Sequence, residues 1–465
     1  MIVRKRNAWF PFRERNPPPS RDRAIGGLVA IVLLTIAPIF SAQDVTQPGR
    51  LLTGKTAMGD WRSDAPGVRR RITVADLPPP SSNVLAINPP RVISGPADAQ
   101  LKVPPGFKID MLASGFRDPR FLLTAPNGDI FVVESRADEI KVIRGAHAET
   151  VELFANRGLN KPFGIAFYPP GDDPQFLYVA NTDGVIRFPY RNGDLKARGP
   201  AEKLKAQLSG GAGFLRSGGH WTRDIVFSPD GKKMYVSIGS RSNDSDDASE
   251  ANRARIFEFN PDGTDQKVYA WGIRNAVGIA FRPGTNELWM STNERDELGD
   301  DLPPDYISSV KPGGFYGWPW FYIGNHADPR HKGQHVRHGT NPSDWRIDLA
   351  SKIIVPDVLV QAHSATLNLC FYGGEQFPPE YKGDIFAAFH GSWNRTGRTG
   401  YKIVHVPFEH STGQVLGEYE DFVTGFVTRD GRVWGRPVGI TVSKDGAVLF
   451  SEDGNGTVWR VSYRK

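Results

Sequence analysis

A repeated hairpin pattern constrains the fold of this chain more than any other feature of its sequence. Each unit has an apolar, strand-like run, a turn that contains glycine, and a second apolar run. Examples are FLLTAPNGDIFVVES at residues 121–135, DIVFSPDGKKMYVSIGS at 224–240 and GITVSKDGAVLFSEDG at 439–454. The turn glycines are Gly128, Gly171, Gly231, Gly284, Gly383 and Gly446. Repeats of about 40 to 60 residues with room for four strands are typical of propeller blades.

The sixth unit is short of one strand. After Gly446 only AVLFSED and GTVWRVSY remain as strand-like runs, whereas GFKIDMLAS at 106–114 precedes the first unit and is unassigned. Pairing this early run with the last unit would close the ring and remove an open sheet edge. We therefore predict that residues 105–465 form an all-β, six-bladed β-propeller whose last blade is closed by an N-terminal strand.

The N-terminal region has the pattern of an export signal. Residues 1–43 hold seven basic and two acidic residues, which accounts for +5 of the formal net charge of +6. A charge-free run, AIGGLVAIVLLTIAPIF, occupies residues 24–40 and is followed by SAQD. This order predicts either a cleaved signal peptide or an uncleaved membrane anchor through residues 24–40. Either outcome predicts a periplasmic or otherwise extracytoplasmic body, tethered to the inner membrane if the anchor stays.

Several functional classes are disfavoured by composition. Without residues 1–43 the chain is almost neutral, so it lacks the basic surface expected of a nucleic-acid-binding protein. The single cysteine, Cys370, excludes a disulfide framework and a Cys-x-x-Cys-His haem attachment site. Residues 44–104 are rich in proline and serine, and we interpret them as an extended lead-in rather than a second domain.

Polar residues recur directly before the first strand of the repeated units. They are His220 and Arg223 in the third unit, Arg274 and Asn275 in the fourth, His363 in the fifth, Arg436 in the sixth and Lys161 in the second. In a propeller the innermost strands all start at one end of a central channel, so these side chains would converge at its mouth. Imidazoles beside fixed cations suit a planar, multiply anionic ligand and a proton transfer. The alternative is that each is a packed or loop-bonding residue of its own blade.

Longer motifs carry a family resemblance. GGHWTRDIVFSPDGKKMYVSIGSRSN, WGIRNAVGIAF, NERDELGDDLPPDYISSVKPGGFYGWP and WGRPVGI resemble the glucose/sorbosone dehydrogenase family, over nearly all of residues 100–465. The family comprises six-bladed propellers, and the branch most similar to this chain is the L-sorbosone dehydrogenase-like one. The resemblance implies a pyrroloquinoline quinone (PQQ)-dependent dehydrogenase that oxidises an aldose or sorbosone-like sugar. It also implies bound Ca²⁺. Because the chain carries no haem motif, we expect the electrons to pass to a separate acceptor, a cytochrome or a quinone.

The resemblance also assigns roles to residues. It implies that His220 is the base that removes the sugar hydroxyl proton, and that Arg274, with Asn275, stabilises the quinone oxygen that gains charge. The cofactor contacts that it implies are His220, Trp221, Arg223, Arg274, Asn275, His363, Trp393, Asn394, Arg395 and Arg436.

Two positions depart from the family pattern. GLNKPFGI stands where relatives place a PQQ-contacting glutamine, and Ser240 stands near the place of the carboxylate that orients the catalytic histidine. The second departure implies that His220 lacks its usual orienting partner.

An acidic loop follows the second strand of the fourth unit. In NERDELGDDLPPDY the resemblance implies calcium, for which Glu294, Asp296, Asp300, Asp301 and Asp305 offer hard oxygen ligands. The alternative is an exposed acidic loop without metal.

Two other functions stay open at this point. One is a lactonase-type hydrolase, which would hold a metal by carboxylates in the channel and use no quinone. The other is a non-catalytic propeller that binds a glycan or protein of the cell envelope, and the two departures from the family pattern favour it.

Overall fold

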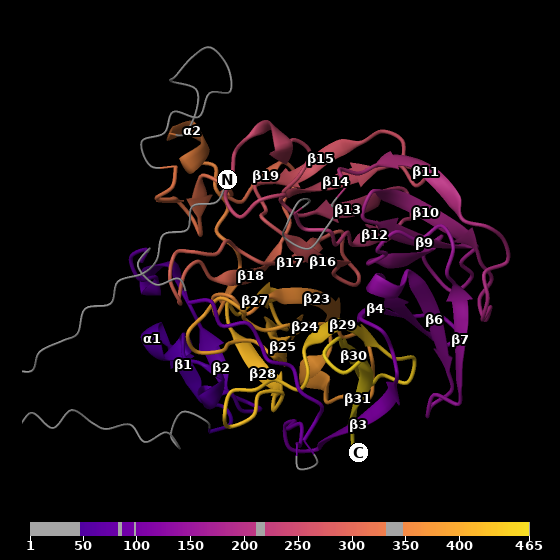
Figure 1. The fold of residues 1–465 in the computed structure, drawn as a ribbon, viewed down its shortest axis with the longest axis horizontal. Coiled ribbons are helices and arrows are strands. Elements are labelled where there is room, and N and C mark those ends of the chain that lie inside the picture. The colour runs from indigo at the N-terminus through magenta and orange to yellow at the C-terminus, as the bar shows by residue number, and fades with distance from the viewer. Residues whose placement is uncertain (1–46, 82–85, 97–98, 211–218, 332–346, 465) are drawn as a thin grey trace, which may run out of the picture. The chain divides into compact units, whose positions relative to one another are not determined.

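The protein is described by a computed structural model over residues 47–81, 86–96, 99–210, 219–331 and 347–464. Within these ranges it consists almost entirely of β-strands (Figure 1), with two short α-helices, α1 (Gly54–Ala57) and α2 (Ile347–Ala350). The predicted signal or anchor segment, residues 1–43, lies outside the described residues. None of the helices in the described part of the chain is long and apolar enough to span a bilayer.

Six sheets form the blades, numbered here in chain order. Blade one contains β4 (Pro119–Thr124), β5 (Ile130–Glu134), β6 (Glu139–Arg144) and β7 (Thr150–Ala155). Blade two contains β8 (Ile165–Tyr168), β9 (Phe176–Asn181), β10 (Gly184–Pro189) and β11 (Glu202–Gln207). Blade three contains β12 (Ile225–Phe227), β13 (Met234–Ile238), β14 (Arg255–Phe259), β15 (Lys267–Trp271) and β19 (Gly314–Phe315).

The other three blades are built in the same way. Blade four contains β16 (Ala276–Phe281), β17 (Leu288–Thr292), β18 (Asp305–Ser309) and β22 (Val358–Val360). Blade five contains β23 (Thr366–Phe371), β24 (Ile385–Phe389), β25 (Lys402–Val406) and β28 (Tyr419–Val423). Blade six contains β29 (Pro437–Val442), β30 (Val448–Glu452), β31 (Thr457–Tyr463) and β3 (Phe107–Ser114). Two small hairpins, β20 (Phe321–Tyr322) with β21 (His326–Ala327) and β26 (Phe408–Glu409) with β27 (Gln414–Val415), lie outside the blades.

The blades close into a ring. The innermost strands β4, β8, β12, β16, β23 and β29 each contact the next one, and β29 contacts β4 again. Blade six is completed by β3, which pairs antiparallel with β31 from Phe107 opposite Tyr463 to Ser114 opposite Thr457. Figure 1 shows this pair as a purple and a yellow strand lying side by side. The predicted six-bladed propeller, with an N-terminal strand closing the last blade, is confirmed.

Burial explains the sequence of the blades. The second strands, such as β5, β17 and β24, are buried at every position and therefore read as continuous apolar runs. Outer strands such as β7 and β11 alternate or are exposed because one face meets solvent.

Glycines in the innermost strands allow adjacent blades to approach closely. A Cβ atom on Gly278 would lie 2.6 Å from the carbonyl oxygen of Leu367, and one on Gly439 would lie 2.8 Å from the amide nitrogen of Leu122. Only glycine therefore fits these two positions, which recur in the AVGIAF and PVGITV motifs.

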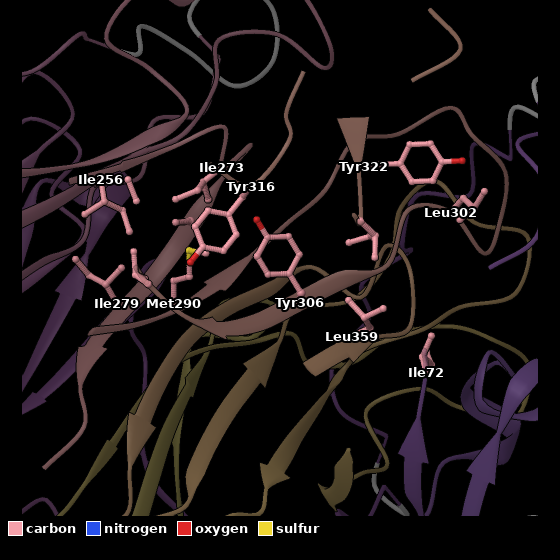
Figure 2. Close-up of a cluster of buried hydrophobic side chains, with 14 of the residues drawn as sticks. Ile72, Ile256, Ile273, Ile279, Met290, Leu302, Tyr306, Tyr316, Tyr322 and Leu359 are labelled. Carbon is pink, nitrogen blue, oxygen red and sulfur yellow. The ribbon is translucent and has the colours of Figure 1, made fainter. Parts of the chain in front are cut away.

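The described part of the lead-in adds strands to blade five. β2 (Arg69–Arg71) pairs with β28, and β1 (Leu51–Thr53) pairs with β2. Ile72, next to β2, enters a buried cluster with Ile256, Met290 and Tyr306 of blades three and four (Figure 2). Ile273 belongs to the same cluster and is fully buried, so it anchors the segment that carries Arg274 and Asn275.

Candidate active site at the channel mouth

The candidate site is built by loops at one end of the ring. His220 precedes β12, Arg274 and Asn275 precede β16, His363 precedes β23 and Arg436 precedes β29. Each of these residues therefore lies at the start of an innermost strand, as the sequence pattern predicted.

Ser240 fixes the tautomer of His220. The Nδ1 atom of His220 lies 2.9 Å from the carbonyl oxygen of Ser240 and 3.1 Å from its hydroxyl oxygen. A carbonyl oxygen can only accept, so Nδ1 carries the proton and Nε2 is left with a lone pair. Although Ser240 has no carboxylate, its backbone thus orients His220, contrary to the implication that this residue lacks a partner.

The imidazole of His220 is kept neutral by its surroundings. Burial, and then the positive charge of Arg274, lower the pKa of His220 to about 3, because both disfavour the imidazolium form. At neutral pH the ring is therefore an uncharged proton acceptor.

Arg274 is held in a fixed orientation. Its Nη1 donates to the carbonyl oxygen of Glu294 at 2.6 Å, its Nε to the carbonyl oxygen of Asn243 at 3.1 Å and its Nη2 to Asn243 Oδ1 at 3.0 Å. These bonds use three of its five N–H groups and fix a nearly buried cation beside His220.

Asn275 contributes an unsatisfied acceptor. Its Nδ2 donates to Asn293 Oδ1 at 3.3 Å, but its own Oδ1 is buried without a hydrogen-bond partner among the described residues. Gly239 packs tightly against both Asn275 and His220: a Cβ atom there would lie 2.1 Å from Asn275 Oδ1 and 2.7 Å from His220 Cβ. A buried oxygen without a hydrogen-bond partner is a feature of a ligand site.

Asp296 links several of the predicted residues. Its carboxylate accepts a hydrogen bond from Asn394 Nδ2, and lies 3.6 Å from His363 Nδ1 and 3.7 Å from Arg274 Nη2. Burial alone would raise the pKa of Asp296, but His363 and Arg274 lower it below its ordinary value. Asp296 is therefore an ionised carboxylate that connects side chains from blades four and five.

A second polar cluster at this end was missed by the sequence interpretation. Arg120 in β4 bonds Asp453, and His390 Nε2 lies 2.9 Å from both carboxylate oxygens of Asp453. Arg436 Nε donates to the carbonyl oxygen of His390 at 3.3 Å. Burial, and then the charge of Arg436, lower the pKa of His390 to about 3. Arg120 stands directly before the apolar run FLLT, just as Arg274 and Asn275 stand before the apolar run AVGIAF. The pattern of polar residues at strand starts could therefore have identified Arg120 as well.

Trp221 connects the two clusters. The guanidinium carbon of Arg120 lies 5.7 Å from the centre of the Trp221 ring, and Phe163 packs edge-on against this ring at 6.1 Å. Blades one, two and three thus meet at an aromatic surface beside His220.

Three predicted cofactor contacts are placed differently from the others. Arg223 is fully buried, and it donates to the carbonyl oxygens of His220, Thr222 and Ser209. It thus supports the backbone of His220 instead of presenting a cation to the mouth. Arg395 donates to Met58 O and Asp301 Oδ1, both at 2.6 Å, and Trp393 is 37% exposed.

Comparison with known proteins identifies the family. A family model described as TrAA12-like matches residues 101–464. The chain belongs to the TrAA12-like family. This membership confirms the relationship to PQQ-dependent sugar dehydrogenases that the motifs indicated.

Relatives of this TrAA12-like protein include proteins with and without a known activity. It is 29% identical over 371 residues to an uncharacterized protein of Borreliella burgdorferi, covering 78% of this chain and 91% of that one. It is 23% identical over 412 residues to the PQQ-dependent pyranose dehydrogenase of Coprinopsis cinerea, covering 77% of this chain and 54% of that enzyme. The holo form of that enzyme's PQQ domain superposes with a TM-score of 0.62 at 20% identity, covering 81% of this chain and 100% of the domain.

In this TrAA12-like protein the acidic side chains predicted as calcium ligands accept hydrogen bonds from protein groups. Asp300 Oδ1 accepts from the amide of Thr396, Asp301 Oδ1 from Arg395, and the two oxygens of Asp305 from the amides of Glu294 and Ala365. Among the described residues, no three Asp, Glu, His or Cys side chains are grouped as metal ligands. The five predicted carboxylates are instead used by protein donors.

Glu294 should make stability depend on pH. Burial raises its pKa to about 8, so the folded chain holds this proton at pH values where the unfolded chain has lost it. We expect the Glu294→Gln variant to gain stability relative to the natural chain as pH rises from about 5 to 8, by up to about 1.4 kcal/mol per pH unit. Urea unfolding at pH 5, 6, 7 and 8 measures this difference. The exposed Glu287→Gln variant is the control, and equal slopes for the two variants would refute the effect.

Proposed function

We propose that this TrAA12-like protein is a PQQ-dependent sugar dehydrogenase that acts outside the cytoplasm. The observation that carries the proposal is the neutral His220, with a free lone pair on Nε2, beside the fixed cation of Arg274 and the orphan oxygen of Asn275. The signal-like pattern of residues 1–43 supports the extracytoplasmic location.

The residues at the mouth fit the chemistry of PQQ. This cofactor is a flat, fused-ring quinone with several carboxylates, so it needs fixed cations and a flat apolar surface. Arg120, Arg274 and Arg436 supply cations from blades one, four and six, and Trp221 supplies an aromatic face. Guanidinium groups are well suited to carboxylates because they can donate two parallel hydrogen bonds.

His220 performs the proton transfer in the proposed reaction. When bound, PQQ supplies the acceptor for the hydride that leaves the sugar carbon. His220 Nε2 takes the hydroxyl proton of that carbon, and Nδ1–H keeps its bond to Ser240, which holds the ring in place. Arg274 stabilises negative charge that develops near it, and its three protein bonds avoid reorganisation during the reaction. The products would be a sugar carbonyl or lactone, the reduced quinone and one proton, which His220 releases readily because its pKa is low.

Two accessory groups complete the proposal. Electrons pass to a separate acceptor, a cytochrome or a quinone, because the single cysteine leaves no Cys-x-x-Cys-His haem motif in the chain. Calcium is assigned no step in the proposed reaction, because the predicted ligands Asp300, Asp301 and Asp305 are hydrogen-bonded to protein groups.

A PQQ titration tests the proposal. We expect the purified protein to bind PQQ, with a change in quinone absorbance, and then to reduce a dye when aldoses are added. Gly239→Ala should weaken PQQ binding about tenfold or more, because the added methyl group collides with Asn275 and His220. Gly373→Ala is the matched control, since a Cβ atom there meets nothing within 4 Å. If the natural chain does not bind PQQ, the proposed dehydrogenase function is refuted.

A further inference from the structure

A pocket with three tryptophans lies beside the candidate active site. It has a volume of about 170 Å³ and is lined by Trp271, Trp318 and Trp320 on one side and by the loop of residues 245–255 on the other. We call it the tryptophan pocket. Aromatic walls with a few placed polar groups are typical of small-molecule sites, and flat indole rings suit the C–H face of a pyranose sugar.

The aromatic rings of the pocket are fixed in place. Trp318 Nε1 donates to the carbonyl oxygen of Asn243 at 3.0 Å, and Trp320 Nε1 donates to Asp246 Oδ2 at 3.1 Å. Trp271 stacks on Phe315 with ring centres 4.2 Å apart. Because these rings are already ordered, binding of a ligand would cost little side-chain conformational entropy at this wall.

Ion pairs hold the two sides of the pocket together. Arg295 lies 2.7 Å from Asp328, next to the tryptophan segment, and 3.2 Å from Asp244 in the opposite loop. Arg330 lies 2.7 Å from the same Asp244 carboxylate. The segment after β19 and the loop between β13 and β14 are thus locked at a fixed separation.

Arg255 supplies a donor that the protein leaves without an ion pair. Its Nε donates to the carbonyl oxygen of Arg253 at 2.8 Å, and no carboxylate pairs with its guanidinium among the described residues. Asp246, Asp247 and Glu250 line the same pocket, so it contains more negative than positive charge. This balance disfavours an acidic sugar and favours neutral hydroxyl groups as partners of Arg255 and the carboxylates.

The pocket is connected directly to the candidate active site. The carbonyl oxygen of Asn243 accepts from both Trp318 Nε1 and Arg274 Nε. Arg253, which lines the pocket, donates through Nη2 to the carbonyl oxygens of His220, at 2.7 Å, and Ser240, at 3.3 Å. A ligand in the pocket therefore rests on the same loop that orients the proposed base.

We propose that the tryptophan pocket binds a neutral pyranose unit, and that the substrate class is a neutral oligosaccharide rather than a free monosaccharide. The substrate assignment rests on the proposed dehydrogenase function, whereas saccharide binding in the pocket does not. The two can therefore be tested separately.

Calorimetry on the full chain without PQQ tests the binding. The probes are cellotetraose, maltotetraose, mannotetraose and xylotetraose, with tetragalacturonate as the acidic comparison. We expect at least one neutral tetrasaccharide to bind, and Trp320→Ala and Arg255→Gln each to weaken it about tenfold or more. Trp61→Ala, which removes a half-buried tryptophan from the lead-in, should leave the affinity unchanged.

The outcomes separate the two proposals. If no neutral tetrasaccharide binds at millimolar concentration, if tetragalacturonate binds more tightly, or if both pocket variants bind like the natural chain, the pocket is not a neutral saccharide site. If a tetrasaccharide binds in the pocket but the protein does not bind PQQ, the saccharide site is supported and the dehydrogenase function is refuted. Unfolding of Trp320→Ala is detected by its melting temperature, and Arg255→Gln then decides the placement.

Discussion

Replacing His220 by alanine is expected to lower kcat/KM for sugar oxidation about 10²–10⁴-fold, the usual contribution of a positioned general base. PQQ binding should persist, because the three arginines at the mouth are unchanged. The physical reason is the free lone pair on Nε2, which exists because Nδ1–H donates to Ser240. Dye-linked rates with a saturating amount of PQQ measure the effect.

The pH dependence gives a second readout for the same residue. A base acts while it is neutral, and His220 is neutral above its pKa of about 3. Activity should therefore not fall through an ordinary histidine pKa of about 6.5 as the pH is lowered from 7 to 5. His410→Ala is the control because His410 is an exposed histidine. Full activity in His220→Ala would exclude this residue as the base.

Replacing Lys402 by methionine is expected to destabilise the fold by about 3–5 kcal/mol, the usual result of removing one member of a buried ion pair. Lys402 Nζ lies 2.8 Å from both Asp64 and Asp421, and Arg70 lies 2.9 Å and 2.7 Å from the same two carboxylates. All four side chains are buried. Without the lysine, two carboxylates would face a single cation away from water.

Urea unfolding of Lys402→Met against Lys382→Met measures this effect. Lys382 also pairs with a carboxylate, Glu375, but both side chains are exposed, and such pairs contribute about 1 kcal/mol or less. Equal stability of the two variants would show that the buried cluster does not hold the lead-in to blade five.

The blades could be predicted because the sequence signals of each hairpin lie within a short stretch of the chain. Each glycine turn joins two strands that are neighbours in the sequence, so the hairpins are visible without knowledge of the ring. The closing strand β3 could be inferred because the last unit was one strand short. The cluster of Lys402 with Asp64 could not, since its members are about 340 residues apart and no local pattern relates them.

The site was predictable in the same local sense. His220, Arg274 and Asn275 stand at strand starts, where the pattern directed attention. His390 and Asp453 directly follow the second strands β24 and β30, so the pattern of polar residues at strand starts does not include them although they reach the same mouth. The acidic loop suggested metal ligands, but the partners of Asp300 and Asp301 come from blade five, and only the folded ring reveals them.

The pairing of β3 with β31 couples the folding of the propeller to its synthesis. The two strands are separated by more than three hundred residues, so the last blade cannot form until residues 457–463 have left the ribosome. Until then the nascent chain lacks the β3–β31 pairing that completes blade six and closes the ring of blades.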